Sequence, residues 1–239
     1  MWSHGIRAIP WRLVLASSGL LIALVMLVEY PSWLLWPLQG IAVGLLTAAV
    51  CWCLDEPLAG VVDAAPRGIL WRTTARLVGV LPLLGVWLVM VWWARPSLFG
   101  HPWSVALQGV AGALAALAWG TARRCAGSAT PGHHWAALVV PAVTAWAIVR
   151  PAQMRVPVFP YATHGVGGSW TSSTVGWSIL GSGALVLLVG LLVTDGRLPR
   201  PGRSSRADRS SGADRRSGPG GSPDVAQALR WDADPRSAQ

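Results

Sequence analysis

The segment with the clearest capacity for chemistry is the charged stretch from Asp55 to Leu77, which lies between two long apolar runs. It opens with Asp55 and Glu56, and Pro57 follows; these residue types favour a helix N-terminus and its first helical position. Apolar residues then recur at helical spacing: Leu58, Val61 and Val62. Pro66 ends this pattern after about two turns. The stretch therefore predicts a short amphipathic helix at a membrane surface.

Arginines follow the predicted short helix and lead into the next apolar run: Arg67, Arg72 and Arg76. An amphipathic helix beside such a basic segment can rest on lipid headgroups or occupy a groove in a partner protein. A connector at the membrane interface with no partner is the alternative. The residues alone leave both interpretations open.

No other set of residues predicts catalysis or a cofactor. Haem or a metal in a helix bundle needs histidines at one depth on facing helices, and the predicted depths of the five histidines do not converge: His4, His101, His133, His134 and His164. The serines of residues 169–173 lie near His164, but the one acid expected on that side is Glu29. The three cysteines are interpreted as small apolar filler. We expect no metal and no cofactor, and the protein is not expected to be an enzyme.

All 19 basic residues are arginine, and lysine is absent. A Walker A loop requires a lysine that reaches the nucleotide phosphates, so this chain cannot carry one. If the protein works by ATP hydrolysis, a separate chain must supply the ATPase. The arginine bias is typical of a GC-rich bacterial genome.

Six stretches of the sequence contain no Asp, Glu or Arg, and the helices that they are expected to form must position these loops. A helix needs about 20 mostly apolar residues to cross a hydrocarbon core of roughly 30 Å, and its backbone groups pair internally. The sequence therefore predicts an all-α, polytopic membrane domain over residues 1–194. Its six transmembrane helices are expected at about 12–29, 33–54, 76–94, 102–122, 133–151 and 175–194. Residues 152–174 are expected to form a solvated outer loop.

Small and polar residues mark predicted contacts between these helices. Small residues permit close approach of two backbones, and we expect such seams at Gly40 and Gly44, at Gly109 and Gly112, and at Gly176, Gly181 and Gly183. Hydrogen bonds between helices are the interpretation for the polar span residues, which are Gln39, Gln108, Thr144, Ser178 and Ser182.

The arginines are distributed unequally between the two sides of the predicted bundle. Sixteen lie at the N-terminal end, in the second-to-third and fourth-to-fifth loops and in the C-terminal segment, against Arg95, Arg150 and Arg155 on the other side. Basic residues accumulate on the cytoplasmic side, so both termini are predicted to be cytoplasmic. Many of the 16 tryptophans lie near predicted span ends, where indole rings anchor helices at the interface.

Residues 195–239 change abruptly in composition to Arg, Ser, Gly, Pro and Asp. Their low apolar content predicts a disordered cytoplasmic tail. Topology and attraction to anionic lipid account for the formal net charge of +9. We therefore expect the lipid bilayer as a partner and no nucleic acid. The plasma membrane of a bacterium is the expected location.

The loop between spans two and three resembles the coupling helix of type-2 ATP-binding-cassette (ABC) transporter permeases. Those proteins have six spans and cytoplasmic termini, and their loop carries an acidic start, a short helix, an Ala-Pro or Thr-Pro with a following Arg, and a basic entry to span three. The matching residues are Asp55, Glu56, Ala65, Pro66, Arg67 and Arg76. The family's larger outer loop between spans five and six has its counterpart in residues 150–177.

The resemblance implies a permease subunit of an ABC-type exporter that works with a cytoplasmic ATP-binding subunit. It implies a homodimer, or a heterodimer with a similar permease, and coupling to the ATPase through loop 55–76. The contact would be made by Asp55, Glu56, Pro66 and Arg67. The main alternative is a non-transporting membrane scaffold or accessory subunit whose tail recruits a partner. A lipid-modifying membrane enzyme is a third hypothesis, although no polar cluster at one membrane depth favours it.

Overall fold

The computed structural model describes residues 9–28, 35–55, 69–149, 158–163 and 168–194, and within these ranges every regular element is helical. The α-helices are α2 (Trp11–Val28), α3 (Leu35–Trp52), α5 (Ile69–Trp93), α6 (Pro102–Cys125), α7 (Pro131–Val149) and α8 (Gly168–Thr194). Two short 3-10 helices, η2 (Arg95–Leu98) and η3 (Pro160–Thr163), lie before α6 and α8. The expected all-α class is confirmed for this part of the chain.

Each predicted span coincides with one α-helix, and the lengths and composition indicate a membrane protein. Among the described residues, three helical segments are long and apolar enough to cross a membrane: Thr73–Trp93, Pro102–Cys125 and Ser169–Thr194. Trp11–Leu27 and Pro37–Trp52 are shorter apolar helices. The six-span topology and the orientation of the termini stay predictions, and the tail of residues 195–239 lies outside the described residues.

Two helices begin well before their predicted starts. α5 begins at Ile69 and α8 at Gly168, so the last residues of the expected outer loop 152–174 form the first turns of α8. The interpretation of that loop as irregular was wrong here because its hydroxyl groups find partners within the fold. Thr174 Oγ1 donates to the carbonyl of Trp170 at 2.8 Å, and Ser173 Oγ donates to the carbonyl of Val158 at 3.1 Å.

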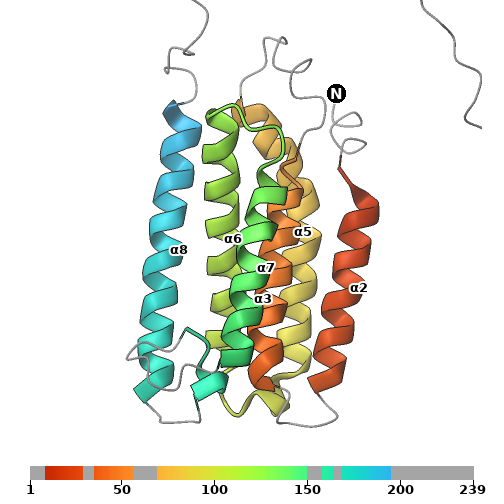
Figure 1. The fold of residues 1–239 in the computed structure, drawn as a ribbon, viewed down its shortest axis with the longest axis vertical. Coiled ribbons are helices and arrows are strands. Elements are labelled where there is room, and N and C mark those ends of the chain that lie inside the picture. Colours follow the sequence, from red (N-terminus) through yellow and green to blue (C-terminus); the bar gives the residue numbers. More distant parts are fainter. Residues whose placement is uncertain (1–8, 29–34, 56–68, 150–157, 164–167, 195–239) are drawn as a thin grey trace, which may run out of the picture. The chain divides into compact units, whose positions relative to one another are not determined.

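Successive α-helices run in opposite directions through the bundle of residues 9–194 (Figure 1). One end carries the C-terminus of α3 and the N-termini of α5 and α7, and we call it the Asp55 end. The other carries η2, η3 and the N-termini of α6 and α8, and we call it the Tyr161 end. The predicted topology places the Asp55 end in the cytoplasm.

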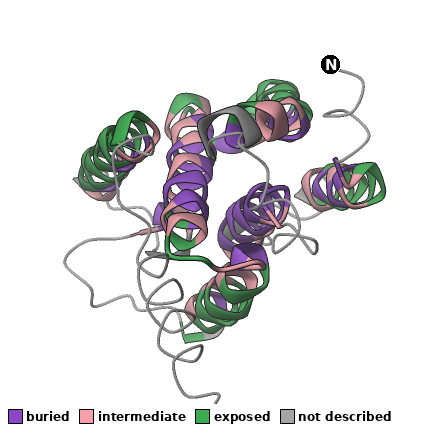
Figure 2. Ribbon diagram, turned by 90° about the horizontal axis from the view of Figure 1, so that it is seen from above, coloured by how far each residue is buried: buried purple, intermediate pink, exposed green. Residues whose placement is uncertain are grey.

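The core lies around α3 and α6, whose residues are the most buried of the bundle (Figure 2). α3 packs against α2, α6 and α7, while α6 also packs against α5 and α8. Fully buried side chains include Leu46 and Val50 of α3, Leu83 of α5 and Ala116 of α6. α3 and α6 thus form the centre of the bundle.

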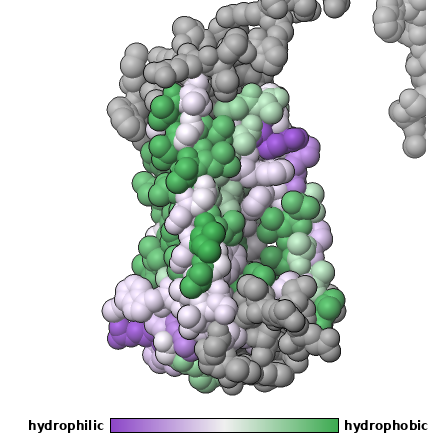
Figure 3. All heavy atoms as spheres, turned by 90° about the vertical axis from the view of Figure 1, so that its left-hand side faces the viewer, coloured by the Kyte–Doolittle hydropathy of each residue, from purple (hydrophilic) through white to green (hydrophobic). Residues whose placement is uncertain are grey.

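The outer helices present apolar residues outward. On the face that includes α8, hydrophobic residues extend over most of the height of the bundle (Figure 3). Val186 is 73% exposed and Ile179 69% exposed, both on α8. Large contiguous apolar surfaces are rare on water-soluble monomers, so this face is suited to contact with lipid.

Glycine permits close approach between helices at two of the predicted seams. A Cβ at Gly109 of α6 would overlap the indole ring of Trp87 on α5. A Cβ at Gly44 of α3 would lie 2.6 Å from Cγ2 of Val143 on α7. These predicted seams are confirmed. The seam expected along α8 is confined to Gly181, since a Cβ at Gly176 or Gly183 would meet open space.

Candidate functional site

The loop predicted to carry the partner contact begins at Asp55, which lies three residues after the end of α3. The amide of Asp55 donates to the carbonyl of Trp52 at 3.0 Å, which holds this extension against the helix. The Asp55 side chain is 11% exposed. This carboxylate is therefore directed into the bundle and is largely removed from solvent.

The Asp55 carboxylate binds the first turn of α7. Its Oδ1 accepts a hydrogen bond from the amide of Gly132 at 2.6 Å, and its Oδ2 lies 2.8 Å from Nδ1 of His133. The first amides of a helix have no partner within the helix, and the N-terminus carries a partial positive charge. α7 has no acidic residue in its own first turn. Asp55 thus caps α7 from a different helix.

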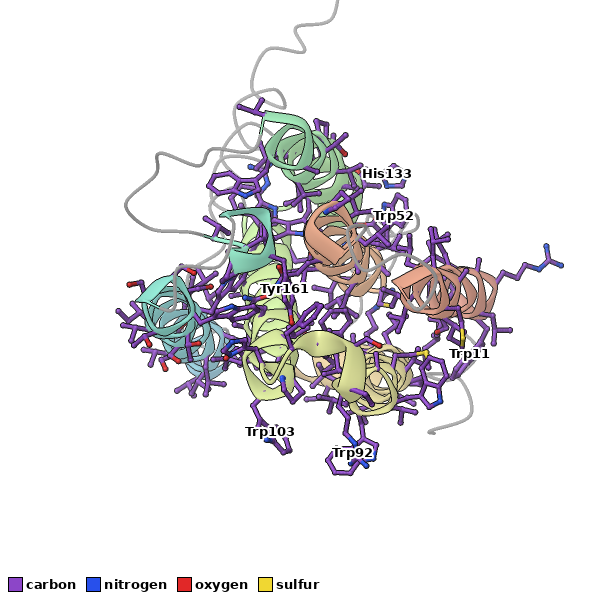
Figure 4. All side chains as sticks on the ribbon, turned by 90° about the horizontal axis from the view of Figure 1, so that it is seen from below. Trp11, Trp52, Trp92, Trp103, His133 and Tyr161 are labelled. Carbon is purple, nitrogen blue, oxygen red and sulfur yellow. The ribbon has the colours of Figure 1, made fainter. Side chains whose placement is uncertain are left out.

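Close contact between the end of α3 and the start of α7 makes this cap possible. A Cβ at Gly132 would lie 2.6 Å from Cα of Trp52, so a larger residue would separate the two backbones. The rings of Trp52 and His133 meet edge to face with their centroids 5.8 Å apart (Figure 4). The His133 side chain is 71% exposed, so this side of the contact faces the surface.

Arg76 of α5 completes the cluster at the Asp55 end. Its Nη1 donates to the carbonyl of Cys53 at 3.0 Å and to the carbonyl of Asp55 at 2.5 Å. The last carbonyls of a helix lack internal partners and favour a nearby cation. The Asp55 cluster, defined as Asp55, Arg76, Gly132 and His133, therefore joins α3, α5 and α7.

Of the four residues predicted to contact an ATPase, the structure describes Asp55. Glu56, Pro66 and Arg67 lie outside the described residues. The carboxylate of Asp55 already has two partners on α7, a contact that the sequence argument did not include. A signal existed in Pro131, which marks a helix start whose first turn lacks an acidic residue.

A neutral polar network crosses the bundle nearer the Tyr161 end. Gln39 of α3 donates from Nε2 to Oε1 of Gln108 on α6 at 2.6 Å, and Gln108 donates from Nε2 to Oγ of Ser173 on α8 at 3.3 Å. All three side chains are buried. The expected hydrogen bond between helices is confirmed for Gln39 and Gln108.

Two of the other predicted polar contacts are internal to their own helices. Thr144 donates to the carbonyl of Val140 and Ser178 to that of Thr174, each four residues earlier. The expectation of contacts between helices was wrong for these two hydroxyls, because a short side chain reaches its own preceding turn more readily than a neighbouring helix.

A cavity of about 40 Å³ lies beside the network, among α2, α3, α5, α6 and η3. Gln39 and Tyr161 line it together with apolar residues, and Gln39 Oε1 is buried without a partner. Tyr161 donates its hydroxyl hydrogen to the carbonyl of Leu98, and burial raises the pKa of the tyrosine. A water needs roughly 10–15 Å³ of such space, so the cavity suits a few waters rather than a substrate.

The histidines that the structure describes lie at both ends of the bundle and do not form a shared site. His101 stacks on Trp170 at the Tyr161 end with ring centroids 4.2 Å apart, whereas His133 lies at the Asp55 end. Within the described ranges, no three His, Cys, Asp or Glu side chains are placed to hold a metal ion.

These features describe a helical membrane protein. It has an ionic cluster at the Asp55 end and a neutral hydrogen-bond network nearer the Tyr161 end. Comparison with protein-family models, with curated proteins and with solved structures found no match.

Proposed function

We propose that this chain is the membrane-spanning permease subunit of an ABC-type exporter, coupled to a separate ATPase through the cytoplasmic loop 55–76. The observation that supports the proposal best is the Asp55 cluster. The two ends of the loop are joined directly, because Arg76 donates to the carbonyls of Cys53 and Asp55. A displacement of the loop would therefore act on α3, α5 and α7 together.

The proposed mechanism begins when ATP closes the two ATPase subunits and moves the loop that rests on them. Through Asp55 the movement reaches the N-terminus of α7, and through Arg76 it reaches α5. α3 lies at the centre of the bundle and transmits the movement to α6. A second permease, identical or similar, would complete the pathway across the plasma membrane of a bacterium. In this proposal Glu56, Pro66 and Arg67 contact the ATPase, and Asp55 transmits the motion.

The test separates contact with the ATPase from transmission of its motion. Tagged full-length protein is purified in detergent, its co-purifying chains are identified, and their ATPase rate is measured with and without the permease. We expect the double variant Glu56→Ala, Arg67→Ala to lose the ATPase. Asp55→Asn is expected to retain the ATPase but to abolish the effect of the permease on the rate of ATP hydrolysis. Arg12→Gln, which removes one exposed charge from α2, is the control and should change neither measurement.

A scaffold is the second candidate, and the seam between α3 and α7 favours it. Val143 fills the space over Gly44, and the cavity beside Gln39 measures about 40 Å³, so this arrangement leaves no room for a substrate there. Deletion of residues 195–239 distinguishes the two. A scaffold that recruits its partner through the tail should lose that partner, whereas a permease should keep its ATPase. Purification of the native protein without any ATPase would reject the permease proposal.

A further inference from the structure

A groove with a volume of about 440 Å³ runs between α5 and α6 at the Tyr161 end. Its walls are apolar, with Leu88 and Val89 on one side and Ala106 on the other. Val89 is 64% exposed, and Leu88 is 45% exposed. The groove thus opens on the outward face of the bundle, where a membrane protein meets acyl chains.

A cation and two indole rings stand at one end of this groove. The guanidinium carbon of Arg95 lies 4.3 Å from the centre of a Trp92 ring. Trp92 and Trp103 have their ring centroids 6.4 Å apart and project outward from the bundle (Figure 4). All three residues line the groove and are exposed. Stacking on an indole holds a guanidinium in place without removing its hydrogen-bond donors.

Among the described residues, no acidic side chain lies near Arg95. Asp55 is the sole acidic residue within the described ranges, and it lies at the opposite end of the bundle. Tryptophan is enriched at the depth of lipid headgroups, and arginine recognises phosphate through two parallel hydrogen bonds. A phosphate at the level of Trp92 would therefore meet both its charge partner and its usual aromatic neighbours.

The geometry points to a specific phospholipid site: one acyl chain lies between α5 and α6, and an anionic headgroup binds Arg95. An extended peptide would leave backbone groups unpaired against these apolar walls, whereas an acyl chain carries no such groups. This inference does not depend on the proposed transport function. It assigns the α5–α6 groove to an anionic phospholipid such as phosphatidylglycerol.

A second groove provides an internal comparison. It has a volume of about 430 Å³, lies between α6 and α8 at the Asp55 end, and includes Trp119, Leu180 and Leu187. Every residue that lines it is uncharged. Its nearest arginine contact is that of Arg123, whose guanidinium carbon lies 5.9 Å from the centre of the Trp119 ring. Acyl chains can occupy both grooves. They differ in that the cation of the α5–α6 groove, Arg95, is itself a lining residue and lies closer to its indole ring, at 4.3 Å.

The experiment measures lipid binding to the full-length protein in detergent by native mass spectrometry, with phosphatidylglycerol and phosphatidylcholine as probes. We expect the native protein to prefer phosphatidylglycerol and Arg95→Gln to weaken its binding about fivefold or more, so that the preference disappears. Arg95→Lys keeps the charge and should retain part of the preference. Arg12→Gln removes the same charge from α2 and should behave as the native protein. Equal preference in the native protein and in Arg95→Gln would overturn the assignment, as would an equal loss in Arg12→Gln.

Filling the groove tests the acyl-chain half of the site. Val89→Trp places a large ring on an exposed wall of the α5–α6 groove, and Leu180→Trp does the same in the α6–α8 groove. We expect Val89→Trp to reduce phosphatidylglycerol binding severalfold and Leu180→Trp to leave the lipid preference unchanged. The assignment is wrong if the two variants have the same effect.

Discussion

The two ends of the bundle hold their helices together with different chemistry. At the Asp55 end, a carboxylate and a guanidinium bind free backbone groups at helix termini. Nearer the Tyr161 end, side-chain amides and a hydroxyl bind one another within the helices. Gln39 lies four residues after the start of α3 and Gln108 six residues after the start of α6, which is deeper than a helix terminus.

The difference follows from where each set of polar groups sits. A helix terminus offers unpaired amides or carbonyls and a partial charge, so an ion placed there gains strong partners. Further along a membrane helix the backbone is already paired, and a charge would lose its hydration with little return. Neutral amides can pair between helices there at a smaller desolvation cost. The four predictions below test this contrast, beginning with the largest expected effect.

Removal of the Asp55 carboxylate should cause the largest loss of stability. Asp55→Ala leaves the Gly132 amide without its acceptor, and we expect a loss of about 2–3 kcal/mol from the missing cap and the unpaired buried donor. The free energy of unfolding is measured by denaturant titration in mixed micelles. Asp55→Asn keeps an acceptor oxygen and should lose less than Asp55→Ala. If the two variants are equally destabilised, the contact with the helix terminus does not carry the effect.

The second largest loss of stability is expected from Gly109→Ala, which overpacks the contact between α5 and α6. A methyl group at Gly109 would overlap the Trp87 ring, and forced repacking typically costs about 1–3 kcal/mol. The matched substitution Gly183→Ala adds the same methyl group where the structure has open space. We expect Gly183→Ala to unfold within about 0.5 kcal/mol of the native protein. A comparable loss in both variants would contradict the packing of α5 on α6.

The neutral network should show a different pattern from the Asp55 cluster. Gln108→Leu leaves Gln39 Nε2 without its acceptor, and we expect a loss of about 1–2 kcal/mol. The double variant Gln39→Leu, Gln108→Leu removes both partners and should recover most of that loss, because apolar side chains are tolerated at this depth. Unfolding measured over the complete double-mutant cycle tests this prediction. Equal stability losses in the single and double variants would count against a paired network.

The smallest effect is expected from Tyr161 and depends on pH. Burial raises the pKa of Tyr161 above its ordinary value of 10.0. The folded state therefore holds the proton more tightly than the unfolded state, and this contribution is complete below pH 10 and declines as the pH rises above it. Tyr161→Phe should lose about 1 kcal/mol at pH 8, where the hydrogen bond to Leu98 is intact.

Unfolding curves at pH 8 and at pH 11 provide the measurement for Tyr161. The native protein should lose stability between these two values, and Tyr161→Phe should lose less. An identical pH dependence in the two proteins would show that other groups control the alkaline transition.

The helices could be located from local composition, and their partners could not. Charge-free runs placed all six α-helices because the apolar content that lipid requires is a property of each segment alone. The early starts of α5 and α8 were missed because polar residues such as Thr174 become helical only when their hydroxyls find partners. At the candidate site, composition marked Asp55 and Arg76 as charged ends of one loop but contained no information about α7.

By itself, the sequence determined that this protein is helical and apolar and that the middle of each helix lacks Asp, Glu and Arg, since these properties follow from residue types in order. It also determined that Gln39 and Gln108 need a partner, because an amide at that depth must be paired. The tertiary structure decided which partners meet: Asp55 with Gly132, 77 residues apart, and Gln39 with Gln108, 69 residues apart. Those pairings depend on which helices lie side by side, and that depends on close packing over glycines such as Gly44 and Gly132. Packing of this kind is a property of two surfaces together, and neither segment specifies it alone.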